Sequence, residues 1–324
     1  MGTPPKVGLL YNPQSLHGAE WYNKQIHKLS AQKQPLAIGT QTPEEIPAAL
    51  QKFAASSITH LAVIGGDGTL DATLTAMRNH SPFQTEPILA LFNAGTTNMT
   101  FRDVGFKTRK HGPLRQFIAA AENNKLKLKQ HRPLYIDSPS LTRPLYGFFL
   151  GTAAIPRAIH HTRQKYHQKG LTNSLSEGAT ILTSLFRLLR RKNVQQDALL
   201  APVQNNIALD GKQKKGPAVL LMVTSLDKLL VGIKPYHGKQ NQGFSVTGIF
   251  YPYGHVWQNI PTLLNGKNEL PFTTNNNFIA TQGQVCSLTF DGEWTLDGEM
   301  YHATSNAPLT VTQANPLTFA VGVA

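Results

Sequence analysis

One short glycine-rich stretch, Ile64-Gly65-Gly66-Asp67-Gly68-Thr69-Leu70, places the strongest constraint on how this chain can fold. The apolar run at 61–64 has the length of a buried strand, and Leu70, Leu74 and Met77 then recur at the spacing of a helix face. A strand that runs through glycines into a helix lets backbone N–H groups approach an anion, because glycine has no side chain and the helix N-terminus is partly positive. The stretch therefore predicts a phosphate site in an α/β fold.

Asp67 is an unusual neighbour for a phosphate group, because a carboxylate beside a phosphate needs a cation between them. A nucleotide bound with Mg²⁺ satisfies that need. In the alternative interpretation, Asp67 only caps the helix and shapes a tight turn. The sequence leaves both interpretations open.

Strands and helices alternate through the first part of the chain. The expected strands are residues 6–11, 36–38, 61–64 and 87–92, and the expected helices include 43–53 and 114–121. Thr42 and Pro43 predict an N-cap and a first helical position for the helix that begins there. This rhythm indicates a doubly wound, mostly parallel sheet, in which ligands bind beyond the carboxyl ends of strands. A polar loop at 93–98 follows the fourth strand at that edge.

The second part of the chain is rich in strand-like runs and poor in helix signals, which predicts a largely antiparallel, sandwich-like β-rich domain. We expect an α/β domain over 1–131, with 310–324 as a candidate final strand that returns to it, and a β-rich domain over 132–309. An amphipathic helix with a basic end is predicted at 175–192. Packing on the sheet and docking on a membrane are both open for that helix.

Composition limits the partners and the compartment. The 324 residues include 31 Lys and Arg against 18 Asp and Glu, a formal net charge of +13, which favours an anionic partner such as nucleic acid, a nucleotide or an acidic membrane. The single cysteine, Cys286, excludes an intramolecular disulfide framework and suits a reducing compartment. No apolar run is long enough to span a bilayer. We expect a cytoplasmic protein whose membrane contact is peripheral.

Four motifs carry a family resemblance. Asn12-Pro13, the glycine stretch at 65–69, Gly95-Thr96-Thr97-Asn98 and Leu296-Asp297-Gly298-Glu299 resemble, in order and spacing, the diacylglycerol kinase catalytic family with its bacterial lipid kinase and sphingosine kinase members. The Gly-Gly-Asp-Gly-Thr motif also occurs in NAD and 6-phosphofructokinases. The Gly-Thr-Thr-Asn and Asp-Gly-Glu elements move the balance toward lipid kinases.

The resemblance implies an ATP- and Mg²⁺-dependent kinase with its active site between the two domains. The acceptor would be the hydroxyl of a diacylglycerol- or sphingoid-like lipid at an anionic membrane surface, at the inner membrane face, and nucleic acid is not an expected partner. Asp297 would deprotonate the acceptor with Glu299 nearby, and Asp67 and Glu299 would bind the catalytic Mg²⁺. The residues implied for nucleotide binding are Asn12, Gly65, Gly66, Asp67, Gly68, Thr69, Gly95, Thr96, Thr97 and Asn98.

Several points stay open at this stage. Asp291-Gly292-Glu293 repeats the catalytic triplet, and we prefer Asp297 because the strands after it better resemble the family's ending. Asn241 and Gln242 stand where the family often has acids, which places a structural Mg²⁺ in doubt. A histidine group is expected to be a solvated basic helix and no metal site; it comprises His160, His161 and His167. A NAD kinase-like enzyme and a non-catalytic lipid-binding protein are the alternative functions.

Overall fold

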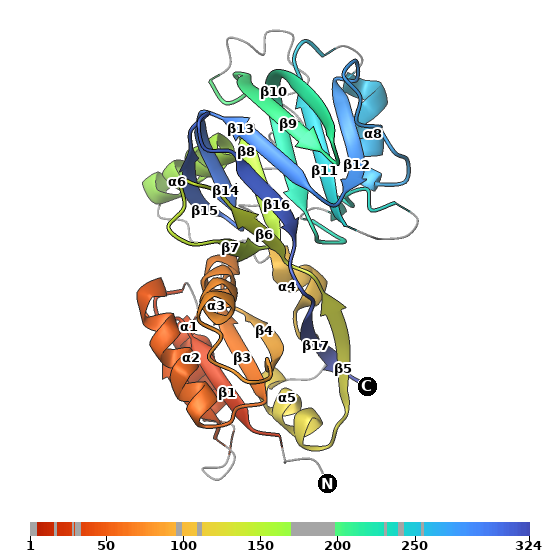
Figure 1. The fold of residues 1–324 in the computed structure, drawn as a ribbon. Coiled ribbons are helices and arrows are strands. Elements are labelled where there is room, and N and C mark those ends of the chain that lie inside the picture. Colours follow the sequence, from red (N-terminus) through yellow and green to blue (C-terminus); the bar gives the residue numbers. More distant parts are fainter. Residues whose placement is uncertain are drawn as a thin grey trace. The chain divides into compact units, whose positions relative to one another are not determined.

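The computed structural model describes residues 5–15, 18–27, 29, 34–94, 99–108, 112–169, 198–229, 232–238, 243–253 and 256–324. The chain divides into two compact units, Met1–Arg132 with Asn315–Ala324, and Pro133–Ala314 (Figure 1). Each unit has its own sheet and core, and each is described by itself. The helix predicted at 175–192 lies outside the described residues.

The first unit is a six-stranded sheet with helices on its faces (Figure 1). The strand order is β2 (Leu36–Gly39), β1 (Val7–Tyr11), β3 (His60–Gly65), β4 (Ile88–Asn93), β17 (Leu317–Val323) and β5 (Leu126–His131). Neighbouring strands are parallel except for β17 and β5. The helices are α1 (Gly18–Ile26), α2 (Ile46–Ala55), α3 (Asp67–His80), α4 (Met99–Val104) and α5 (Pro113–Glu122). The predicted doubly wound α/β domain is confirmed.

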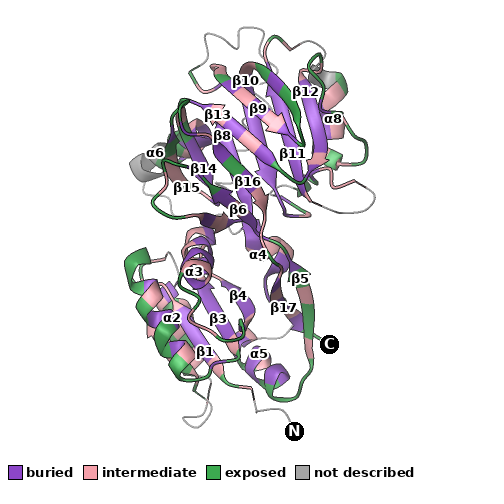
Figure 2. Ribbon diagram, viewed as in Figure 1, coloured by how far each residue is buried: buried purple, intermediate pink, exposed green. Residues whose placement is uncertain are grey.

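Buried side chains pack against both faces of this sheet. On one face, Ile64 and Phe92 join a core cluster with Phe117 of α5, and the rings of Phe92 and Phe117 are 5.9 Å apart. On the other face, Phe53 of α2 lies so close to β1 that a Cβ at Gly8 would be 2.8 Å from its ring. The residues drawn as buried in Figure 2 run along the central strands. Because side chains pack against both faces of the sheet, a ligand site is expected at the ends of the strands.

The helix predicted to begin at Pro43 begins later. Pro43–Glu45 form a single 3₁₀ turn (η2), and α2 starts at Ile46. Thr42 is extended and its side chain makes no capping hydrogen bond, while the Glu45 carboxylate accepts a hydrogen bond from the Gln41 N–H at 2.7 Å. The glutamate therefore stabilises the loop that follows β2 and does not complete a capping box with Thr42.

The second unit is built on antiparallel strands, as predicted. Its main path is β15 (Glu299–Ala303), β14 (Gly292–Leu296), β8 (Phe149–Ala153), β10 (Lys212–Thr224), β9 (Val203–Leu209), β13 (Cys286–Phe290), β16 (Leu309–Gln313), β6 (Leu134–Asp137) and β7 (Leu145–Gly147). β11 (Phe244–Phe250) pairs with β10, and β12 (Phe278–Gly283) pairs with β11. The described helices are α6 (Ala154–Lys169) and α8 (Val256–Asn265). Trp294 and Cys286 are fully buried in the core of this unit.

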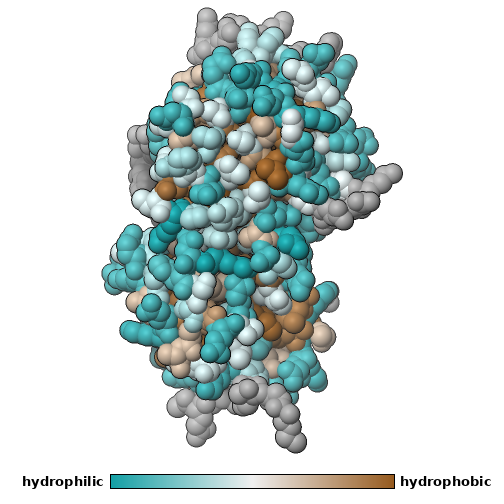
Figure 3. Space-filling model, viewed as in Figure 1, coloured by the Kyte–Doolittle hydropathy of each residue, from teal (hydrophilic) through white to brown (hydrophobic). Residues whose placement is uncertain are grey.

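The surface is mostly hydrophilic on the face drawn in Figure 3. Within the described part of the chain, no helix combines the length and the apolar character needed to cross a bilayer. Burial raises the pKa of the Cys286 thiol, so the reactive thiolate is disfavoured, as expected for an inert buried cysteine.

Strand β17 supplies the first test. Phe319 is fully buried, and it is opposite Leu89 of β4 and Lys129 of β5. We expect Phe319→Ala to lower the free energy of unfolding by about 3–5 kcal/mol, because it removes a large core side chain. The measurement is urea-induced unfolding of the full chain. Thr318→Ala, next to it in the strand, is the matched control and should cost about 0.5 kcal/mol or less.

Candidate functional site

The glycine stretch lies at a point where the order of strands in the sheet reverses direction. From β1 the chain passes to β2 on one side and later to β3 on the other side, so the carboxyl ends of β1 and β3 flank a topological switch point. The backbone N–H of Asn12 donates to the carbonyl of Ile64 at 3.1 Å, which joins the two strand ends directly. Open α/β sheets bind ligands at such points. The structure thus brings together Asn12 and the glycine stretch, and the role of both in nucleotide binding stays a prediction.

Glycine is required where the stretch turns into α3. A Cβ at Gly65 would be 2.6 Å from the Oγ1 atom of Thr69, so the close approach of strand and helix needs a residue without a side chain. Gly66 is the N-cap and is extended, with φ −94° and ψ −174°. Because glycine carries no capping side chain, no side-chain hydrogen bond caps the first N–H groups of α3. This is the local geometry of an anion site.

The carboxylate of Asp67 holds the neighbouring helix. Its Oδ2 accepts the Met99 N–H at 2.8 Å and its Oδ1 accepts the Thr100 N–H at 3.0 Å, so the first residue of α3 caps α4. The side chain is only 8% exposed. Burial raises the pKa of the Asp67 carboxyl group, and the hydrogen bonds from Met99 and Thr100, which favour the charged form, oppose that rise. Asp67 therefore does not cap its own helix, whose N-cap is Gly66, and its carboxylate caps α4 instead. Its role in Mg²⁺ binding stays a prediction.

The second motif, Gly95-Thr96-Thr97-Asn98, lies outside the described residues, but both of its flanks are attached to the glycine stretch. On one side the Ala94 N–H donates to the Gly65 carbonyl at 3.1 Å. On the other side Met99 donates to Asp67. The two motifs are therefore joined through their flanking residues.

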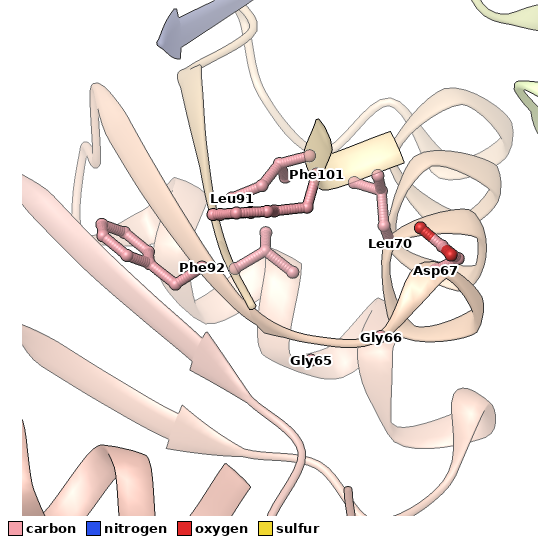
Figure 4. Close-up of a pocket in the computed structure, with 8 residues that line it drawn as sticks. Gly65, Gly66, Asp67, Leu70, Leu91, Phe92 and Phe101 are labelled. Carbon is pink, nitrogen blue, oxygen red and sulfur yellow. The ribbon is translucent and has the colours of Figure 1, made fainter. Parts of the chain in front are cut away.

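A small cavity lies behind the glycine turn (Figure 4). Its volume of about 10 Å³ is close to the space that one water molecule occupies. Apolar side chains of β3, β4, α3 and α4 form most of the wall. The lining residues are Val63, Gly65, Gly66, Asp67, Leu70, Leu91, Phe92 and Phe101. We regard this cavity as a packing gap beneath the site, because a nucleotide base could not enter it.

The sequence did not indicate the end of β2 as part of this edge. Thr40 is 3% exposed, and its N–H donates to the Tyr11 carbonyl at 2.9 Å, which places it beside the end of β1. Next to it, the Gln41 Oε1 accepts the Gln14 amide at 3.4 Å. A lone threonine after a short strand carries no motif. Thr40 lies at this edge because β2 is next to β1 in the sheet, and the sequence does not show that order.

Asp297 occupies the turn between β14 and β15 in the second unit. Its Oδ2 accepts the Phe148 N–H at 2.7 Å and its Oδ1 accepts the Phe149 N–H at 2.9 Å. The residue is 6% exposed and has a left-handed backbone with φ +47°. A Cβ at Gly147 would be 2.5 Å from Asp297 Oδ2, so a larger residue there would displace the carboxylate.

The two Asp-Gly-Glu triplets differ in their surroundings. Asp291 is exposed at the turn between β13 and β14, and its Oδ1 accepts the Ser305 N–H at 2.7 Å. Glu299, the first residue of β15, is also exposed. Among the acidic residues of the two triplets, Asp297 alone is buried, and its carboxylate binds the start of β8. The choice between Asp297 and Asp291 as the base stays a prediction, and this geometry supports Asp297.

The described residues contain no group of three or more His, Cys, Asp and Glu side chains that could hold a metal ion. His160 Nε2 is 3.3 Å from the Glu293 carboxylate, with both side chains about half exposed, and His161 is exposed. The side chain of His167 is not among those described. The residues at the doubtful structural Mg²⁺ site, Asn241 and Gln242, also lie outside the described residues.

Comparisons with known proteins point to one family. Residues 6–130 match the diacylglycerol kinase catalytic domain. A solved structure of a proposed diacylglycerol kinase from Bacillus anthracis str. Sterne aligns with a TM-score of 0.66 and 17% identity, over 99% of this chain and 98% of its own. A second structure, also of a proposed diacylglycerol kinase from this organism, aligns with a TM-score of 0.65 and 16% sequence identity over 99% of each chain. At these identities the structures share the fold. No curated protein matches the sequence.

The Asp67 contacts generate a stability test. We expect Asp67→Ala to lower the free energy of unfolding by about 1–3 kcal/mol, because it leaves the buried N–H groups of Met99 and Thr100 without their acceptor. Hydrogen exchange at these two amides should become faster. Asp67→Asn is the control: it keeps one acceptor oxygen and should have an intermediate effect. Unchanged exchange in Asp67→Ala would contradict the assignment.

Proposed function

We propose, from the match of residues 6–130 to the diacylglycerol kinase catalytic domain, that the chain is an ATP- and Mg²⁺-dependent lipid kinase. It would transfer the γ-phosphoryl group of ATP to a hydroxyl group of a diacylglycerol- or sphingoid-like lipid. The observation that carries the proposal is the glycine turn, which presents the open N-terminus of α3 at the switch point of a parallel sheet.

We propose that the phosphates of ATP bind at this edge of the first unit. Backbone N–H groups at Gly66, Gly68 and Thr69 would donate to phosphate oxygens, and no side chain at Gly65 or Gly66 obstructs them. The residues Asn12, Gly95, Thr96, Thr97 and Asn98 complete the proposed nucleotide site. Oriented backbone donors of this kind stabilise charge on a transferred phosphoryl group without reorganising during the reaction.

Asp67 and Glu299 are the residues that we propose for Mg²⁺. A carboxylate has about four acceptor positions, and each Asp67 oxygen uses one of them for a backbone N–H, so Asp67 retains capacity for a metal or its water. Kinase sites hold Mg²⁺ with one or two carboxylates and the nucleotide phosphates. When bound, the ion would supply positive charge to the phosphates.

Asp297 is the proposed general base. A lipid alcohol is a weak nucleophile at neutral pH, so a carboxylate within hydrogen-bond reach assists its attack by accepting the hydroxyl proton. The hydrogen bonds from Phe148 and Phe149 fix the direction of the Asp297 carboxylate. A base whose orientation is fixed before the substrate arrives costs less to align in the transition state.

The excess of basic residues supports peripheral contact with an anionic membrane, where the lipid would be met. Purified protein, radiolabelled ATP, Mg²⁺ and mixed micelles of diacylglycerol or sphingosine make up the deciding assay. We expect label in the lipid, dependent on Mg²⁺. Label in NADP from added NAD would point instead to a NAD kinase. Vesicle binding without any transfer would indicate a non-catalytic lipid-binding protein.

The two triplets can be separated by matched substitutions. We expect Asp297→Asn to lower kcat by about 10²- to 10⁴-fold, as removal of a general base does, while ATP binding measured by calorimetry is retained. Asp291→Asn should stay within about 2-fold of the wild type, because that carboxylate is an exposed turn acceptor. Loss of activity in Asp291→Asn with retention in Asp297→Asn would show that the other triplet supplies the base.

A further inference from the structure

We propose that Thr224, at the end of β10, is a positioning residue for the Asp297 carboxylate and acts through the peptide unit between Phe148 and Phe149. The inference rests on the proposed role of Asp297 in lipid phosphorylation. Thr224 is fully buried and belongs to none of the motifs of the family resemblance.

One peptide unit, between Phe148 and Phe149, connects Thr224 to Asp297 through hydrogen bonds. The Thr224 hydroxyl donates to the carbonyl oxygen of Phe148 at 2.8 Å, and the Ser225 N–H donates to the same oxygen at 3.1 Å. The N–H at the other end of that peptide unit belongs to Phe149, and it donates to Asp297 Oδ1 at 2.9 Å. A trans peptide unit is planar and its C=O and N–H point in opposite directions. Fixing the carbonyl therefore fixes the direction of the N–H that holds Asp297.

The hydroxyl group is itself held in place. Thr224 Oγ1 accepts the Leu226 N–H at 3.1 Å, so the oxygen is both a donor and an acceptor and its proton is directed at Phe148. Thr224 is also the strand partner of Phe149 in the pairing of β10 with β8. A hydrogen bond to a carbonyl polarises the attached N–H and strengthens the bond that it donates. Thr224 thus affects both the direction and the strength of the Phe149 contact with Asp297.

The backbone of Asp297 also contacts Phe149. Its N–H donates to the Phe149 carbonyl at 2.9 Å, so backbone and side chain of Asp297 both bind Phe149. The Arg163 guanidinium, from α6, donates to the Gly298 carbonyl at 3.0 Å on the other side of the turn. With the turn held at both ends, the carboxylate direction depends on two N–H groups: that of Phe148, which binds Oδ2, and that of Phe149, which binds Oδ1 and belongs to the peptide unit next to Thr224.

Thr224→Val tests this, because valine keeps the shape of threonine and removes its hydroxyl. We expect kcat for lipid phosphorylation to fall about 10-fold while KM for ATP stays unchanged, since misaligned catalytic groups lower the rate more than binding. Thr224→Ser restores the hydroxyl and should recover kcat to within about 3-fold of the wild type. Thr247→Val, at a buried threonine of the neighbouring strand β11, is the matched control and should retain full activity.

A second readout does not depend on activity. In protein labelled with ¹⁵N-phenylalanine, the Phe149 amide should lose its downfield shift and exchange faster in Thr224→Val, and recover in Thr224→Ser. Should valine prevent folding, the serine and alanine variants provide the same comparison. An unchanged Phe149 amide, or a kcat in Thr224→Val equal to that of Thr247→Val, would overturn the proposal. If the wild type phosphorylates no lipid, the proposed function fails, and the amide signal alone decides whether Thr224 positions Asp297.

Discussion

Asp67, Asp210 and Asp297 share one interaction, in which a single carboxylate accepts hydrogen bonds from two consecutive backbone N–H groups. Hydrogen bonds to a charged acceptor are about twice as strong as neutral ones. Asp210 makes this contact with Gln284 and Val285 at an exposed turn, outside any motif. The contact itself is therefore structural. The other two differ in their positions. Asp67 joins the start of α3 to the start of α4 at the carboxyl ends of parallel strands, and Asp297 joins a tight turn to the beginning of β8.

Local patterns carried most of what could be predicted from the sequence. The glycine stretch, the apolar run before it and the helix spacing after it depend on neighbouring residues, and the structure has the strand, turn and helix as expected. The α/β class of the first unit and the antiparallel class of the second follow from the same kind of signal. Asn12 was named only through the family resemblance, and its backbone bond to Ile64 places it at the end of β3.

Contacts made by backbone groups could not be predicted in this way. Asp67 and Asp297 both bind N–H groups, which every residue except proline has, so no residue type marks the partner. Phe148 and Phe149 would serve this purpose with almost any side chain. Thr40 was missed for a related reason, because only the order of strands places it beside β1. The later start of α2 shows a third limit: the sequence indicated a capping box in which Glu45 binds Thr42, and the Glu45 carboxylate binds the Gln41 N–H instead.

Strand β17 has a consequence for how the protein is made. It lies between β4 and β5, so those two strands have no partner in common until β17 leaves the ribosome. The residues of the second unit, Pro133–Ala314, are all synthesised before β17. Domains fold as units during synthesis, usually in the order in which they emerge. In this chain the first unit is interrupted by the second, so β4 gains its β17 partner only after all residues of the β-rich unit have been synthesised.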